Sequence, residues 1–183
     1  MTAQIGDTIR YAGQHFTLVG VSPDNPYDKL FDPERFGIQT FSSCTACWQG
    51  YVAAFGIQEK RLMLEELAIN IRNHGWDEET KRMKPRPHGP AINGVLPVQP
   101  DNPKASAFSD YYHSVNLPLS FTGSLLLGKD FIQELYEHGG SQQDWKYQKV
   151  LLLSFADGVL TVAHSRTAEM AITREAKLKA RKS

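Results

Sequence analysis

The chain has 183 residues, with 20 basic and 20 acidic side chains and hence a formal net charge of zero. This length fits one domain and supports a core without disulfide or metal cross-links. No apolar run approaches the roughly 18 residues that a membrane-spanning helix needs. Residues 1–13 also lack the basic and apolar segments of a secretory signal. We therefore expect a cytoplasmic globular protein with reduced thiols.

The balanced charge is unevenly distributed along the chain. Between Arg166 and Lys182 there are six basic and two acidic side chains, so this segment carries +4 and the rest of the chain −4. An acidic body lacks the clustered Lys and Arg that phosphate contacts require, which disfavours nucleic-acid binding by the folded domain. We expect one domain over 1–165 and a basic helix or tail over 166–183. The tail either contacts RNA or an acidic partner, or is a solvated helix end whose cations complement the helix dipole.

The first 72 residues are predicted to form two hairpins separated by a loop. The first hairpin turns at Ala12-Gly13-Gln14, and three prolines then mark the loop. The second hairpin turns at Glu59-Lys60. Its second arm also fits a helix, but an alternation that slips at Glu65-Glu66 favours a strand with a bulge. The strands expected in this half are 8–11, 15–21, 37–41, 50–58 and 61–72.

A proline-rich segment at 73–106 interrupts this pattern. It contains Trp76, four closely spaced basic side chains and prolines at 85, 87, 90, 97, 100 and 103. Each proline ring removes a backbone donor and fixes φ, which excludes regular secondary structure over this length. Such a long loop is typical either of a binding loop or of a surface insertion, and both alternatives stay open.

The C-terminal part is predicted to contain a strand, a short helix, a hairpin and a final helix. Gly139-Gly140 closes the short helix, and Asp157-Gly158 between apolar runs is a strong hairpin signal. Apolar positions are sparse in the final helix, which predicts loose packing or none. The fold class is α+β, a mostly antiparallel sheet of about six to eight strands with one short packed helix and a C-terminal helix. The expected elements are a strand at 117–127, a helix at 129–138, strands at 149–155 and 159–164, and a helix from Ser165 or Thr167 to about Lys182.

The two cysteines of the chain form Cys44-x-x-Cys47, which allows three interpretations. A redox pair needs its first cysteine at a helix N-terminus, where the thiol pKa falls. Here a central strand over 48–57 is expected to follow instead. A zinc site needs a second pair of ligands, and the candidates His74, His88 and His113 are far apart in sequence. We therefore favour buried, inert thiols, with a redox pair and a metal site as alternatives, and we predict no cofactor.

Asp110-Tyr111-Tyr112-His113 could supply a general base with an orienting carboxylate. The sequence contains neither a Gly-x-Ser-x-Gly elbow nor a glycine-rich phosphate loop. A catalytic interpretation therefore reduces to a thiol enzyme that uses Cys44 and Cys47, with His113 as its base.

Aromatic residues provide a second functional hypothesis. Tyr111, Tyr112 and Trp145 stand in polar surroundings, and Trp76 lies in the proline-rich segment. Aromatic side chains are enriched in protein interfaces and often dominate their energetics. The favoured hypothesis is thus a non-enzymatic protein-binding factor of the immunity or accessory type, which binds its partner through these four residues. The thiol enzyme is the alternative.

Three segments, CWQGYVAAFGIQEKRLMLEEL, FTGSLLLGKDFIQELYEHGG and VLLLSFADGVLTV, together resemble a loose group of small uncharacterised bacterial proteins. The resemblance implies a Trp-x-Gly-Tyr strand that turns into a second strand, a Phe-x-Gly strand that runs into a short helix, and a terminal hairpin. It brings no activity with it, and it includes neither Cys44 nor the proline-rich segment. The residues that carry it are Trp48, Gly50, Tyr51, Phe121, Gly123, Asp157 and Gly158.

Overall fold

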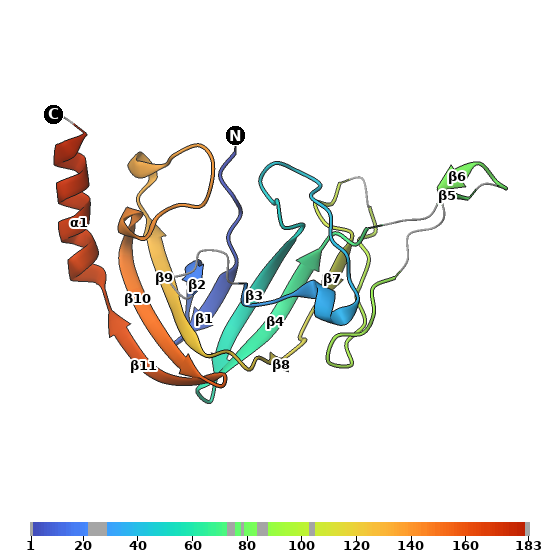
Figure 1. The fold of residues 1–183 in the computed structure, drawn as a ribbon, viewed down its shortest axis with the longest axis horizontal. Coiled ribbons are helices and arrows are strands. Elements are labelled where there is room, and N and C mark those ends of the chain that lie inside the picture. Colours follow the sequence, from blue (N-terminus) through green and yellow to red (C-terminus); the bar gives the residue numbers. More distant parts are fainter. Residues whose placement is uncertain are drawn as a thin grey trace.

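The computed structural model describes residues 2–21, 29–72, 76–77, 79–83, 88–102 and 105–181. Their main feature is one curved, mostly antiparallel sheet with a helix near the C-terminus (Figure 1), so the predicted α+β class is confirmed. The nine described strands of this sheet exceed the predicted range by one. The elements are β1 (Thr8–Tyr11), β2 (Gln14–Val21), η1 (Pro33–Phe36), β3 (Tyr51–Gln58), β4 (Arg61–Ile69), β5 (Trp76–Asp77), β6 (Arg82–Met83), β7 (Asp110–Tyr112), β8 (Leu117–Pro118), β9 (Gly123–Phe131), η2 (Gln133–Leu135), η3 (Asp144–Lys146), β10 (Tyr147–Ala156), β11 (Val159–Ser165) and α1 (Thr167–Ala180), where η denotes a 3-10 helix.

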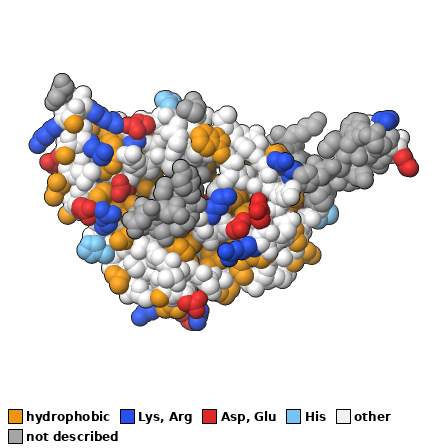
Figure 2. All heavy atoms as spheres, in the orientation of Figure 1, with side chains coloured by type: hydrophobic (Ala, Val, Ile, Leu, Met, Phe, Trp, Pro, Cys, Tyr) orange, Lys and Arg blue, Asp and Glu red, His pale blue; other side chains and the backbone are white. Residues whose placement is uncertain are grey.

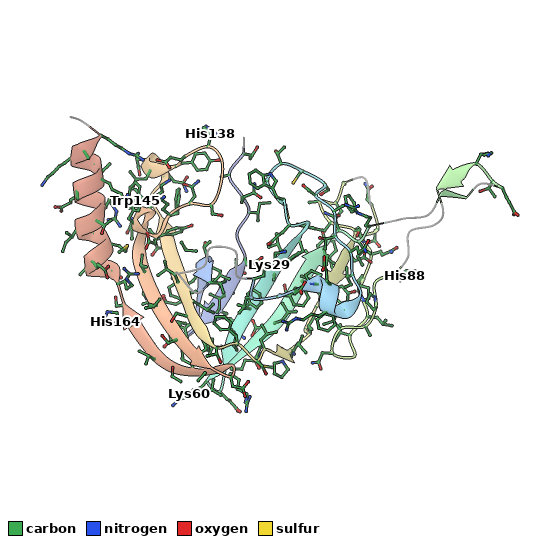
Figure 3. The ribbon with its side chains drawn as sticks, in the orientation of Figure 1. Lys29, Lys60, His88, His138, Trp145 and His164 are labelled. Carbon is green, nitrogen blue, oxygen red and sulfur yellow. The ribbon has the colours of Figure 1, made fainter. Side chains whose placement is uncertain are left out.

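The sheet has the strand order β11-β10-β9-β2-β1-β3-β4-β7, with β8 also paired to β4. All neighbours are antiparallel except β1 and β3, which run parallel. β11 meets β4 at one point, where Val159 lies opposite Arg61. The N–H of Leu160 donates there to the carbonyl of Lys60 at 2.7 Å. The sheet is therefore closed at this end, around Lys60, and open at the other (Figures 1 and 3).

The core fills the inside of this curved sheet, and a second apolar cluster covers the outside of β9 and β10. Successive residues of a strand point to opposite faces, so Leu125 and Leu127 belong to the inner core whereas Leu126 belongs to the outer cluster. The outer cluster includes Trp145 and Met170 and is covered by α1. β9 is thus buried on both faces, which explains its run of consecutive leucines.

The predicted hairpins are confirmed. β1 and β2 pair around Gly13, and β10 and β11 pair around Asp157 and Gly158, both with positive φ. β3 and β4 pair with a register shift in which Ala54 faces Glu66 and Phe55 faces Leu64. Glu65 is therefore the extra residue of a bulge, and the slip in its alternation predicted the bulge correctly.

Two predicted elements are wrong. The strand at 37–41 reduces to one isolated bridge between Thr40 and Ile71. The helix at 129–138 is absent, because β9 continues to Phe131 and only the 3-10 turn η2 follows. Phe131 pairs with Tyr147 of β10, and their rings pack edge to face with centroids 5.2 Å apart. This cross-strand aromatic contact outweighs the local helix propensity.

Two further expectations are modified. The strand expected at 117–127 is interrupted at 119–122, where the carbonyl of Phe121 accepts from the N–H of Gly158 at 2.8 Å. The final helix, α1, is firmly docked rather than loose. Met170 is buried, and Arg174 donates to the carbonyls of Trp145 and Tyr147 at 2.8 and 2.6 Å. One guanidinium thus provides contacts that the sparse apolar pattern did not predict.

Part of the proline-rich segment packs on the core. Ile92 is fully buried, and the hydroxyl of Tyr112 donates to the carbonyl of Pro90 at 2.8 Å. Val98 forms an isolated β-bridge with Tyr111 of β7. Some residues of the predicted proline-rich segment and of the predicted tail, including His74 and Lys182, lie outside the described residues. No helix among the described residues is long and apolar enough to cross a membrane.

Candidate functional site

The loop that holds both cysteines is a series of turns. The N–H of Cys47 donates to the carbonyl of Cys44, and the N–H of Gly50 to that of Cys47, both at 3.2 Å. Strand β3 begins only at Tyr51, so the prediction that Trp48 starts a central strand is wrong. The side chain of Trp48 is 56% exposed. Gly50 has a φ of 77°, in the left-handed region that glycine adopts readily and other residues rarely do.

The N-terminal segment fixes this loop. The N–H of Ile5 donates to the carbonyl of Ala46 at 2.8 Å, and the N–H of Trp48 donates to Oε1 of Gln4 at 3.0 Å. Nε2 of Gln4 also donates to the carbonyl of Thr45 at 2.8 Å. These bonds hold the backbone at Trp48 while its indole stays exposed, and Ile5 is itself 49% exposed.

Ile5 and Trp48 line a cavity of about 300 Å³, which we call the Trp48 groove. A second cavity of about 520 Å³ lies beside it, and both are lined by Val19, Gly20, Val21 and Ser141. The two cavities therefore share the C-terminal end of β2. The residues that line the Trp48 groove are Gln4, Ile5, Gly6, Asp7, Leu18, Val19, Gly20, Val21, Cys47, Trp48, Gln49 and Ser141.

Among the described residues, Asp7 has the only charged side chain that lines the Trp48 groove. Its Oδ1 accepts from the N–H of Ala53 at 2.8 Å and from Nε2 of Gln49 at 3.4 Å. Among the described residues no donor reaches its second oxygen, Oδ2. Burial raises the pKa of Asp7 to about 6, and the two hydrogen bonds only partly oppose this effect. The groove therefore contains a poorly solvated carboxylate at neutral pH.

The surroundings of Cys47 disfavour a reactive thiol. Cys47 is buried and donates to the carbonyl of Tyr51 at 3.2 Å, whereas Cys44 is exposed, and both are free. Burial raises the pKa of Cys47, which disfavours the nucleophilic thiolate. Burial also raises the pKa of the neighbouring Tyr51. In the described part of the chain no group of three or more His, Cys, Asp or Glu side chains is placed to hold a metal ion.

The four aromatic residues predicted to bind a partner do not lie together. Tyr112 is fully buried in the core, and Trp145 is 3% exposed beside α1 (Figure 3). Tyr111 is half-buried, with its ring parallel to that of His113 at 6.3 Å. Trp76 belongs to β5, in a hairpin beyond the main sheet (Figure 1). Of the three whose side chains the structure describes, Tyr111 alone lines a cavity without being buried in the core.

The alternative catalytic set is also divided. His113 is exposed and lines a separate groove of about 310 Å³ with Tyr111, Tyr112 and Glu66, on the outer face of β3, β4 and β7. Cys47 lines the Trp48 groove instead. Asp110, expected to orient the base, is fully buried and accepts from the hydroxyl of Ser109 at 2.5 Å. A thiol–imidazole pair is therefore not formed within either cavity.

No protein-family model, curated protein or solved structure compared with the chain matches it. The resemblance to a bacterial group thus stays a prediction. Sequence reasoning found the loop at 44–50 but missed the exposure of Trp48, and it did not select Ile5 or Asp7. The one sequence signal for Asp7 was its position directly before the strand that begins at Thr8.

Proposed function

We propose that this chain is a non-enzymatic protein-binding factor of the accessory or immunity type, and that its partner occupies the Trp48 groove. The observation that carries the proposal is the exposure of Trp48 beside the exposed Ile5 at the edge of a groove. Exposed apolar side chains at a cavity are typical of interaction sites, and tryptophan is enriched among the residues that dominate binding energy.

The shape of the site favours a polypeptide as the occupant. The Trp48 groove and the cavity beside it share lining residues of β2, and the second cavity reaches Asp144 and Arg166, so an extended segment could contact both. A small-molecule pocket instead encloses most of its ligand. Fixed backbone contacts at Gln4 and Ile5 also mean that little ordering is needed when a partner binds, which favours affinity.

The thiol alternative has less support. The raised pKa of Cys47 and the separation of His113 from it both work against a nucleophilic cysteine. The cytoplasmic location and the absence of a cofactor stay predictions from the sequence. Contact between an acidic partner and α1 stays a prediction too, although Figure 2 shows Lys and Arg side chains gathered over that helix.

The test is a quantitative comparison of variants. Tagged protein is used to capture partners from extracts of the cells that make it, and the captured protein is then purified and titrated calorimetrically. Trp48→Ala is expected to weaken binding at least tenfold, a loss of about 1.4 kcal/mol or more. Tyr136→Ala is the matched control, because Tyr136 is 42% exposed and lines neither cavity. Unchanged binding by Trp48→Ala would overturn the proposal.

A further inference from the structure

We infer that the Trp48 groove takes up a lysine or arginine side chain of the partner, whose cation pairs with the carboxylate of Asp7 while its aliphatic stem packs on the indole of Trp48. This inference rests on the proposed function and specifies the chemistry of the residue that anchors the partner. Three features of the groove carry it: its charge, its aromatic wall and the hydrogen bonding of Asp7.

The charge of the groove is unbalanced. Of the described residues that line it, Asp7 alone carries a carboxylate, and none is a Lys or Arg. The other polar side chains there, including those of Gln4, Gln49 and Ser141, are neutral. A partly buried carboxylate without a cation is unfavourable, and an incoming ammonium or guanidinium would remove that penalty.

The hydrogen bonds of Asp7 leave room for such a cation. Both described donors, the N–H of Ala53 and Nε2 of Gln49, reach the same oxygen, Oδ1. Oδ2 has no partner among the described residues, and it is not sealed from solvent, since Asp7 keeps some exposure and lines the cavity. A charge-assisted hydrogen bond to Oδ2 therefore requires no existing bond to break.

Trp48 supplies the second half of the site. A cation near an indole face is stabilised by the ring quadrupole, and the aliphatic stem of Lys or Arg packs against apolar surface. The chain already contains this contact elsewhere. Lys146, Lys177 and Arg181 lie 5.4–5.5 Å from the ring centroid of Trp145. The described residues place no cation over Trp48, so its exposed ring is available for one from the partner.

Cation binding should depend on pH through Asp7. In the described part of the chain, the ionisable groups around its carboxyl are the Cys47 thiol and the Tyr51 hydroxyl, with Cys44 beyond them, and none of these is a cation. With a pKa of about 6, Asp7 is almost fully ionised at pH 7.5 and about one-tenth ionised at pH 5. Because only the ionised form attracts the cation, the apparent affinity should fall about tenfold between these pH values.

The experiment uses N-acetyl-arginine amide as the probe and the indole N–H signal of Trp48 in ¹⁵N-labelled full-length protein as the readout. N-acetyl-norleucine amide is the uncharged control. We expect a saturable shift with a Kd in the millimolar range for the arginine probe. Binding should be about tenfold weaker at pH 5, and similarly weak at both pH values in Asp7→Asn. Asparagine retains an acceptor for the N–H of Ala53, so this variant is expected to fold.

Three results would overturn the inference: equal shifts with the norleucine probe, undiminished arginine binding by Asp7→Asn, or no saturable shift at pH 7.5. If Asp7→Asn does not fold, the pH dependence of the wild-type protein decides the question alone. The captured partner separates this inference from the proposed function. A partner that is lost by Trp48→Ala but retained by Asp7→Asn supports the function and refutes the cation. A partner retained by Trp48→Ala refutes both.

Discussion

Trp48 and Trp145 are the same residue type in opposite situations. Trp145 follows Gln142, Gln143 and Asp144 in the sequence, yet it is 3% exposed. Trp48 precedes an apolar strand, yet it is 56% exposed. The polarity of neighbouring residues therefore predicts neither environment. What decides the exposure of each ring is the element that covers it after folding.

Trp145 is covered because α1 returns to it from the far end of the chain. Arg174 of α1 donates to the carbonyl of Trp145, and the indole N–H donates to Oε1 of Gln143 at 2.6 Å. Glu137 pairs with the buried Lys146 and with Arg181, which links the neighbouring loop to the end of α1. Trp48 has a fixed backbone but no such cover among the described residues. One tryptophan is therefore part of the packed fold, and the other is the one that we propose binds a partner.

The largest expected effect tests this division directly. Trp145→Ala removes a buried ring from the cluster under α1 and should lower the free energy of unfolding by about 3–5 kcal/mol. Trp48→Ala removes an exposed ring and should lower it by less than about 1 kcal/mol. Urea denaturation of both variants, followed by circular dichroism, gives the two values. Similar losses in the two variants would contradict the division between a structural and a binding tryptophan.

A smaller effect concerns the carboxylate beside Trp48. The pKa of Asp7 is about 6 in the folded protein against an ordinary 3.8, so the folded state binds this proton more tightly than the unfolded chain does. The contribution of this tighter proton binding to the free energy of unfolding is fully present below about pH 4 and is lost as the pH rises through 6. Asp7→Asn should therefore be more stable than the wild type by about 1–2 kcal/mol at pH 8, after allowance for solvent screening, and nearly equal to it at pH 4.

Denaturation midpoints measured from pH 4 to 8 check this prediction. Asp157→Asn is the matched control, because Asp157 is an exposed turn residue at which asparagine is also well tolerated. Its stability relative to the wild type gives the background for the loss of one surface carboxylate, against which Asp7→Asn is compared at each pH. A pH-independent difference for Asp7→Asn would mean that the carboxyl of Asp7 is not desolvated by the fold.

The parts of the fold that were predictable depend on short-range signals. Turns at Gly13 and Asp157-Gly158 and the alternation slip at Glu65 each act within a few residues, so they define hairpins and a bulge locally. The errors have distant causes. The helix expected at 129–138 yields to the contact between Phe131 and Tyr147. Similarly, the parallel pairing of β1 with β3 and the closure of β11 on β4 depend on residues far apart in sequence.

The site was predictable only in outline. Cys44-x-x-Cys47 drew attention to the right loop, but through chemistry that the burial of Cys47 disfavours. Asp7 had no visible motif, because its burial arises from the parallel pair, in which Asp7 accepts from the N–H of Ala53 across 46 positions. The loop that presents Trp48 is held by hydrogen bonds from Ile5 to Ala46 and from Trp48 to Gln4, which hydrophobic patterning cannot reveal.

The two cysteines give the smallest expected effect on stability and the sharpest contrast within the Trp48 loop. Cys44 is exposed and Cys47 buried, so an alkylating reagent at pH 7.5 should modify only Cys44 in the native protein. Cys47 should react only on unfolding, because burial raises its pKa and its thiol is bonded to the carbonyl of Tyr51. Cys44→Ser should change the free energy of unfolding by less than about 0.5 kcal/mol. Mass spectrometry of samples taken at successive times counts the labels on each cysteine. If Cys47 in the native protein is labelled rapidly below pH 7, the thiol enzyme becomes the better hypothesis.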